Sequence, residues 1–310
     1  MTIPPLVVGI DISKHHLDVF DPAVGRAERF DNEPAAIAVL ARRFAKAQAT
    51  VVFEATGHYD SALRRGLADA GVACSRVNPA RARHFARAAG FLAKTDAVDA
   101  RMLTAMGQTL KPRITPPVEP DRERLALLNR RRDQLVANRQ QERTRRKECQ
   151  DAAIAASIAS HLAWLDQEIE TIEAAIAELI KANPAILSLT RLLRSVPGIG
   201  PVTATTLVAH APELGHCSPK SIAALAGLAP FNNDTGLFRG KRSIRGGRKR
   251  LRDALYIAAV SASRSKSRFG RFYRILREAG KEPKQAFIAV ARKLLVTLNA
   301  IARDGVPFHP

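Results

Sequence analysis

The sequence predicts a mixed α/β domain, followed by a long helical segment and then a mostly α-helical domain. Short apolar runs alternate with helical periodicity up to about residue 110. Four prolines then fall between Lys111 and Pro120, a composition typical of a linker. From Arg122 to Lys181 the helical pattern contains neither glycine nor proline. We therefore expect domains at 1–111, 112–185 and 186–310.

The composition indicates a partner that carries many negative charges. The 310 residues include 49 Lys+Arg against 29 Asp+Glu, a formal net charge of +20. Such an excess favours nucleic acid. The basic stretches lack an opposing Trp/Leu-rich face, and no apolar run approaches the roughly 20 residues of a membrane span, so we expect no membrane partner. Three widely spaced cysteines and no recognisable leader suggest a reducing, cytoplasmic location without disulfides or a zinc site.

Two acids follow apolar runs that resemble buried strands. Asp11 stands near the end of a run that starts at Val7, and Glu54 ends a β-branched run that starts at Thr50. A buried acid needs a compensating group, so Asp11 either binds a metal ion or caps a turn. Sites in open α/β sheets form beyond the carboxyl ends of strands. The other elements expected in this domain are strands at 17–20, 28–30 and 72–77, and helices at 34–46, 61–70 and 95–110.

Asp96 and Asp99 are three residues apart and share one face of the last of these helices. Acids also favour the first turn of a helix, where they meet its dipole, so this pair alone has an ordinary explanation. Together with Asp11 and Glu54, they make four acids in a strongly basic chain. Hard divalent cations prefer oxygen ligands, and two such ions suit phosphodiester chemistry.

The same residues carry a family resemblance. The stretches GIDISKHHLDV, FEATGHYDSAL and KTDAVDARMLT resemble, in order and rough spacing, the motifs of the RuvC-like DEDD transposases of the one-ten insertion-sequence family. The resemblance implies an RNase H-like fold with a mixed sheet. It also implies that Asp11, Glu54, Asp96 and Asp99 bind Mg²⁺, with Mn²⁺ as a possible substitute.

The long helical segment has a narrow apolar stripe. Its second half places apolar residues at spacings of three and four, as in a long helix or a helical hairpin with a coiled-coil seam. These residues are Ile158, Leu162, Leu165, Ile169, Ile172, Ile176 and Leu179. The stripe fits either an intramolecular arm or dimerisation, and the family resemblance favours a homo-oligomer, dimer or tetramer.

The last domain begins with a candidate helix-hairpin-helix element. Gly198 and Gly200 lie in a Val-Pro-Gly-Ile-Gly-Pro turn between two helical stretches. Backbone N–H groups in such a turn can hold a DNA phosphate, although a plain helix connection has the same pattern.

A basic, glycine-interrupted stretch follows, with eight basic residues and no acid from Arg239 to Arg252. We interpret it as a phosphate-binding loop that opens onto a helix. The candidate nucleic-acid ligands are Arg239, Lys241, Arg242, Arg245, Arg248 and Arg252. Farther on, Phe269, Phe272 and Tyr273 interleave with arginines, and their spacing of three and four favours a core position over base stacking.

This region also resembles the family's C-terminal transposase domain, through APFNNDTG and the later RGKR and IRGGR. The resemblance implies a serine nucleophile before the glycine, but this chain has Thr235 there. Threonine keeps a hydroxyl while its methyl group restricts the approach to phosphorus. Three alternatives stay open: Thr235 is the nucleophile, the site is disabled, or Ser243 substitutes.

The expected function is that of a DNA transposase or recombinase, which by resemblance is guided by a non-coding bridge RNA that pairs with donor and target DNA. The alternatives are a RuvC-type structure-specific nuclease that uses metal-activated water, and a non-catalytic nucleic-acid-binding protein.

Overall fold

The computed structural model describes residues 6–309 except 58, 92, 94, 118, 233, 236, 237 and 241, and it leaves out the side chains of 234, 238 and 239. The chain divides into two compact units, Met1–Val118 and Glu119–Pro310. The helical segment therefore belongs to the same unit as the C-terminal helices. The three-part division at 1–111, 112–185 and 186–310 stays a prediction.

The N-terminal unit contains the mixed sheet that the sequence predicts. Its strand order is β3-β2-β1-β4-β5. The first three strands are antiparallel neighbours, whereas β1, β4 and β5 run parallel. The strands are β1 Val7–Ile12, β2 His16–Phe20, β3 Ala27–Asp31, β4 Thr50–Glu54 and β5 Cys74–Val77.

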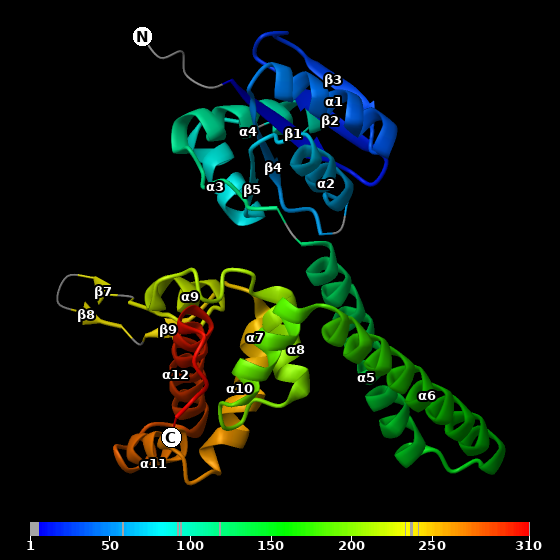
Figure 1. Cartoon of the computed structure of the whole chain (residues 1–310), viewed down its shortest axis with the longest axis vertical. Helices are drawn as coiled ribbons and strands as arrows, with labels where there is room; N and C mark the ends of the chain where they lie inside the picture. Colours follow the sequence, from blue (N-terminus) through cyan, green and yellow to red (C-terminus); the bar gives the residue numbers. More distant parts are fainter. Residues whose placement is uncertain are drawn as a thin grey trace. The chain divides into compact units, whose positions relative to one another are not determined.

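Helices cover both faces of this sheet (Figure 1). On one face, Val8 and Ile10 pack with α1 (Pro34–Lys46) and α2 (Ser61–Asp69). On the other, Val7 and Val52 pack with α3 (Pro79–Ala88) and α4 (Asp96–Leu110). Alternate residues of β1 thus enter two different apolar layers, as the pleat of a central strand requires.

Helix α4 crosses directly over β1. A Cβ added to Gly9 would lie 2.6 Å from the backbone nitrogen of Thr104, and one added to Gly107 would lie 2.6 Å from Val7. Since later residues of α4 contact earlier residues of β1, the two run antiparallel. The first turn of α4 therefore lies at the carboxyl end of β1.

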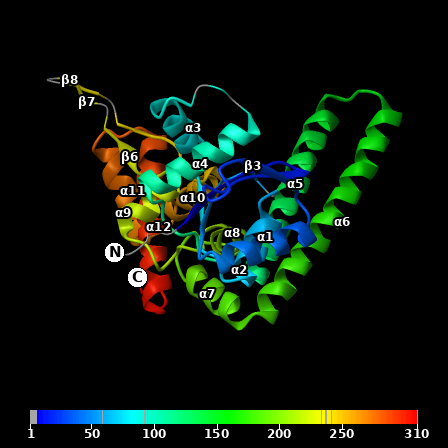
Figure 2. The same cartoon turned by 90° about the horizontal axis from the view of Figure 1, so that it is seen from above.

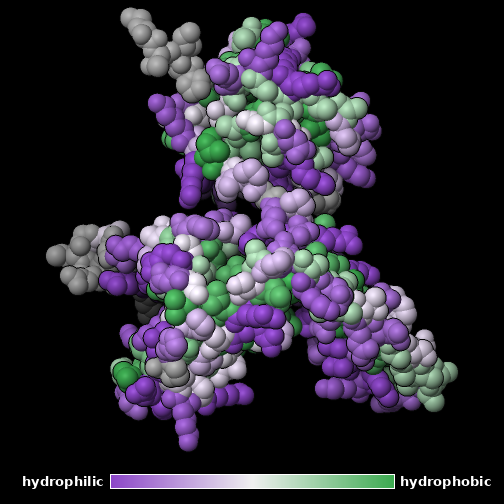
Figure 3. All heavy atoms as spheres, viewed as in Figure 1, coloured by the Kyte–Doolittle hydropathy of each residue, from purple (hydrophilic) through white to green (hydrophobic). Residues whose placement is uncertain are grey.

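The segment after the linker is a helical hairpin, one of the two forms the sequence allows (Figure 2). Its arms are α5 (Pro120–Glu148) and α6 (Ala152–Ala182). Leu135, Leu165 and Ile169 form the buried seam between them. Hydrophilic side chains cover much of the rest of the hairpin (Figure 3). A coiled coil and an oligomer built on it stay predictions.

Six helices form most of the rest of the C-terminal unit as described. They are α7 Pro184–Arg194, α8 Pro201–His210, α9 Pro219–Leu225, α10 Lys249–Ser263, α11 Arg268–Glu278 and α12 Pro283–Asp304. Helix α12 is long and apolar enough to cross a membrane by length and composition alone, a test that a core helix also passes. Its apolar side chains, such as Val290, Leu294 and Leu298, are fully buried in the core of this unit. Phe269 is also fully buried, as its spacing predicts.

Candidate active site

Two of the predicted acids lie at the carboxyl ends of the neighbouring parallel strands β1 and β4. Ile10 of β1 pairs with Phe53 of the parallel strand β4. Asp11 and Glu54 each follow these residues directly, so both stand where their strands end. On β2, Asp18 lies opposite Asp11.

Helix α4 brings the other two acids to the same end of the sheet, because it runs antiparallel to β1. Its cap is Thr95, whose Oγ1 accepts a hydrogen bond from the Val98 backbone N–H at 3.3 Å. Asp96 and Asp99 fall in the first turn that follows. Asp96 and Asp99 therefore occupy the first turn of the helix, and they also lie near enough to Asp11 to affect its charge.

Asp11 responds electrostatically to all three other acids. Partial burial and the charges of Asp99, Asp96 and Glu54 raise the pKa of Asp11 from 3.8 to about 6. A hydrogen bond with the Ile12 backbone opposes this shift. Burial and like charges both disfavour the charged form of a carboxyl group, so a bound cation would stabilise the Asp11 carboxylate.

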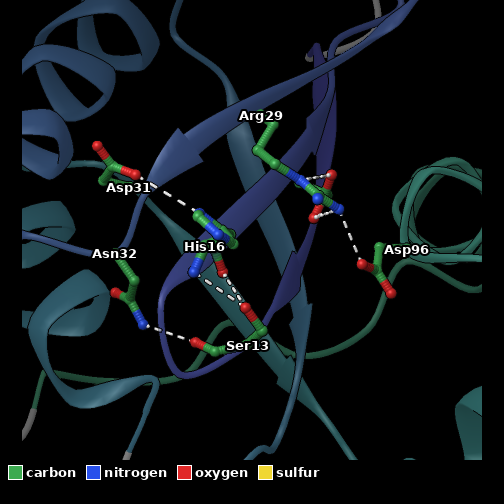
Figure 4. A network of polar contacts seen from close by, with 7 residues as sticks. Ser13, His16, Arg29, Asp31, Asn32 and Asp96 are labelled. Atoms are coloured by element: carbon green, nitrogen blue, oxygen red, sulfur yellow. Dashed lines mark hydrogen bonds and ion pairs between the residues drawn. The ribbon is translucent and has the colours of Figure 1, made fainter.

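Arg29, which the sequence analysis did not select, already neutralises part of this charge. Its guanidinium binds Asp18 through two hydrogen bonds of 3.0 and 3.1 Å, and it reaches Asp96 at 2.8 Å (Figure 4). The Asp18 side chain is only 8% exposed, so this carboxylate needs its cation. Arg29 lies opposite Asp18 on β3, a pairing that depends on the register of two strands.

A polar turn fixes the chain just beyond Asp11. The Ser13 hydroxyl donates to the His16 carbonyl and accepts from the His16 N–H, at 3.0 and 2.9 Å. The Asn32 side chain donates to the Ser13 carbonyl at 3.0 Å (Figure 4). These bonds tie the end of β1 to β2 and to the end of β3, which limits the positions open to Asp11.

The chemistry of the donors fits a hard divalent cation. Four carboxylates supply the oxygen ligands that such ions prefer, and burial together with the charges of the other three raises the pKa of Asp11. The Thr56 Oγ1, two residues beyond Glu54, is buried with no hydrogen-bond partner among the described residues. However, no three His, Cys, Asp or Glu side chains of the described chain stand close enough together to form a finished metal site. The fit is one of charge and donor type.

Thr235 is exposed and lies on a short two-stranded ribbon in the C-terminal unit. It belongs to β7 (Asp234–Thr235) and pairs with Phe238 of β8 (Phe238–Arg239). Ser243, the alternative nucleophile, is exposed on β9 (Ser243–Ile244) opposite Phe231 of β6 (Pro230–Phe231). Both hydroxyls are on exposed residues, so exposure does not separate the two candidates.

The predicted basic ligands differ in what they contact. Arg242 is exposed, and Arg245 lies over the Phe231 ring at 5.0 Å from its centre. Arg252 donates to the Gly246 carbonyl at 2.6 Å. Arg248 binds Glu213 through bonds of 2.7 and 2.6 Å, so its charge is already paired. Lys241 and the side chain of Arg239 lie outside the described residues.

The glycines of this unit have structural reasons that the sequence did not indicate. Gly247 meets the backbone of Gly227 so closely that an added Cβ would lie 2.5 Å from the Gly227 Cα. Gly198 has a φ of +89°, and a Cβ there would lie 2.7 Å from the Ala258 carbonyl of α10. Gly200, by contrast, faces open space at the start of α8. A side chain would therefore be excluded at Gly198 by packing and by backbone conformation, but not at Gly200.

Comparisons with known proteins agree with these features. A protein-family model described as Transposase, for the DEDD domain of the IS110 group, matches residues 8–154. A second family model, described as Transposase IS116/IS110/IS902 family, matches residues 190–274.

Individual relatives are similar over longer stretches. A pilin gene-inverting protein of Moraxella bovis is 30% identical over 97% of this chain and 97% of its own length. Its counterpart in Moraxella lacunata is 30% identical over 83% of this chain and 81% of its own length. An IS110 protein of Streptomyces coelicolor is 32% identical over 48% of this chain and 36% of its own length. The mixed sheet and the helical C-terminal unit are consistent with a RuvC-like DEDD fold.

Proposed function

Because the chain belongs to the IS110 family of transposases, it is an enzyme that acts on DNA, and we propose that it cuts and rejoins DNA with two sets of residues. Asp11, Glu54, Asp96 and Asp99 hold Mg²⁺, for which Mn²⁺ can substitute. The hydroxyl of Thr235 is the nucleophile. The observation that carries the metal half is the raised pKa of Asp11, because it arises from burial and from the three other acids.

The bound metal supplies stabilisation of the negative charge that builds up on the phosphate. The chain supplies the rest. The Thr235 Oγ bonds to phosphorus while one phosphorus–oxygen bond to a deoxyribose breaks, and the hydroxyl proton ends on the leaving oxygen. The number of phosphoester bonds is unchanged, so the reverse step can rejoin a strand. Arginine side chains of the 239–252 stretch offset charge on the phosphate.

The names of the Moraxella relatives support rejoining, since inverting a gene requires DNA strands to be cut and joined again. By family resemblance, a non-coding bridge RNA pairs with donor and target DNA, and the protein works as a homo-oligomer in the bacterial cytoplasm, at the nucleoid. The hairpin α5–α6 is the segment we propose for oligomer contacts. Delegating sequence choice to base pairing suits a protein whose predicted contacts are to phosphates.

A covalent adduct separates this mechanism from hydrolysis. The protein is incubated with end-labelled DNA carrying the insertion-sequence ends, bridge RNA and Mg²⁺, and then denatured. Recombinase chemistry leaves label attached to the protein, whereas a nuclease that uses water leaves free 5′-phosphate ends. A non-catalytic binding protein leaves the DNA intact.

The same assay on Thr235→Ser and Thr235→Ala tests the nucleophile. We expect Thr235→Ala to lose the adduct and Thr235→Ser to keep or increase it, because serine lacks the crowding methyl group. Ser243→Ala serves as the matched control and should leave the adduct in place. An adduct that survives Thr235→Ala and disappears with Ser243→Ala would transfer the role to Ser243.

A further inference from the structure

Helix α3 presents three arginines on its exposed side. It is anchored by Ala82, which is fully buried, while Arg81, Arg83 and Arg87 are exposed. No acid occurs between Pro79 and Ala88. The Asn78 side chain already caps the helix, accepting from the Ala80 N–H at 2.8 Å, so the backbone start of the helix is satisfied.

These arginines are unlike others in the same unit. Arg43 binds Asp21 and Glu28, and both Arg64 and Arg76 bind the buried Asp60. Those side chains stabilise the fold by neutralising acids. Among the described residues, Arg81, Arg83 and Arg87 have no such acid, so their charges face solvent.

The spacing on α3 works against the helix itself. Arg83 and Arg87 are four residues apart and therefore neighbours on its surface, where like charges are mildly destabilising. Arg81 and His84 flank them. A cluster of this kind gains stability when a polyanion neutralises it. Arginine suits phosphate best, because its guanidinium can donate two parallel hydrogen bonds.

The position of α3 selects the phosphate. Glu54 pairs with Val77, and α3 begins two residues after Val77, at the sheet edge where Asp11 and Glu54 stand. We propose that the exposed arginines of α3, with Arg83 and Arg87 side by side, bind the phosphate backbone of the DNA strand that reaches this end of the sheet. The inference rests on the proposed function and adds to it a DNA-positioning surface within the N-terminal unit.

Salt dependence of DNA binding tests this surface in the full-length protein. The triple variant Arg81→Gln, Arg83→Gln, Arg87→Gln is titrated into a fluorescein-labelled DNA duplex at several salt concentrations. The slope of log affinity against log salt is negative, and each lost phosphate contact makes it shallower by ~0.9. We therefore expect the triple variant to have a slope shallower by ~3. Between 50 and 200 mM salt, its affinity should then fall by a factor ~40-fold smaller than that of the wild type.

A charge-matched control separates a specific surface from general attraction. Arg26→Gln, Arg42→Gln and Lys46→Gln together remove the same charge from β3's preceding turn and from α1, which packs on the opposite face of the sheet. The control should leave the slope unchanged. Circular dichroism and thermal unfolding of both variants show whether each is folded, and the single variant Arg87→Gln replaces the triple if it is not.

Two outcomes overturn the inference. One is an equal slope change in the two variants, which reduces α3 to part of the net charge. The other is a change seen with an RNA duplex but not with DNA, which assigns α3 to RNA. Failure of the proposed function is separate, since it appears as wild-type protein that binds DNA but neither cuts nor rejoins it.

Discussion

At the scale of single residues, the charge of Asp11 is unfavourable where it stands, because the side chain is partly buried beside other acids. Asp11→Asn removes a carboxylate that is partly buried beside three other acids. The pKa of Asp11 in the folded protein, about 6, lies above the ordinary value of 3.8. The contribution of Asp11 to the free energy of unfolding therefore falls as pH rises between these two values. We expect Asp11→Asn in EDTA at pH 8 to be more stable than the wild type by ~1 kcal/mol, after allowing for solvent screening.

Metal binding reverses this comparison. Mg²⁺ or Mn²⁺ should raise the melting temperature of the wild type and leave that of Asp11→Asn nearly unchanged, because the variant lacks a carboxylate ligand. Differential scanning fluorimetry with each ion and with EDTA measures both effects. Equal stabilisation of the two proteins by metal would remove Asp11 from the site.

The pair of Arg29 and Asp18 gives a third prediction at this scale. Arg29→Gln leaves the buried Asp18 carboxylate without its cation and should lower the midpoint of urea unfolding. Asp18→Asn in the Arg29→Gln background removes the unpaired charge and should recover most of the loss. If the double variant does not recover the lost stability, then Arg29 stabilises the unit through another contact, such as its bond to Asp96.

At the scale of elements, the turn between α7 and α8 contains two glycines with different constraints. Gly198→Ala introduces a Cβ at a φ of +89° and against the Ala258 carbonyl, which we expect to cost ~3 kcal/mol. Gly200→Ala meets open space and should cost less than ~1 kcal/mol. Urea unfolding of the two variants measures the difference, and similar costs would contradict the packing described for α10.

The junction of α5 and α8 should be sensitive to acid. His210 Nε2 lies 3.1 Å from the Asn129 Oδ1, and burial together with Arg250, Arg130 and Arg248 lowers the pKa of His210 from 6.5 to about 4. The unfolded chain therefore takes up a proton first, and stability falls as pH drops below 6.5. We expect wild type to lose ~2 kcal/mol more than His210→Gln between pH 7 and 5, measured by urea unfolding.

Elements and acids differ in how far the sequence could predict them. The strands that carry Asp11 and Glu54 at or near their ends were predictable, because apolar runs bounded by turn residues are local signals. The bond from Arg29 to Asp18 and Asp96 joins β3, β2 and α4, so it depends on strand register, which sequence periodicity does not specify. Gly247 packs against Gly227, which is twenty residues earlier in the chain, so this reason for a glycine is not visible in the local sequence, where Gly247 suggested a phosphate-binding loop.

At the scale of the whole molecule, the two compact units have separate cores and divide between Val118 and Glu119. The proline content of residues 112–120 predicts a linker there. In the structure, the chain after 111 runs beside the edge strand β5. The Thr115 N–H donates to the Cys74 carbonyl at 2.7 Å, the Ser75 hydroxyl donates to the Pro112 carbonyl at 3.0 Å, and the Arg76 N–H donates to the Thr115 Oγ1 at 2.8 Å.

These contacts predict how fragments will behave. A fragment of residues 1–118 should fold by itself, because its sheet and four helices enclose their own apolar layers. A fragment of residues 1–111 loses three hydrogen bonds on β5 and exposes that edge, at a cost of ~1–3 kcal/mol. Urea unfolding followed by circular dichroism compares the two. Equal midpoints would show that residues 112–118 serve only as a linker, whereas a lower midpoint for the shorter fragment would show that they stabilise the edge of the N-terminal sheet.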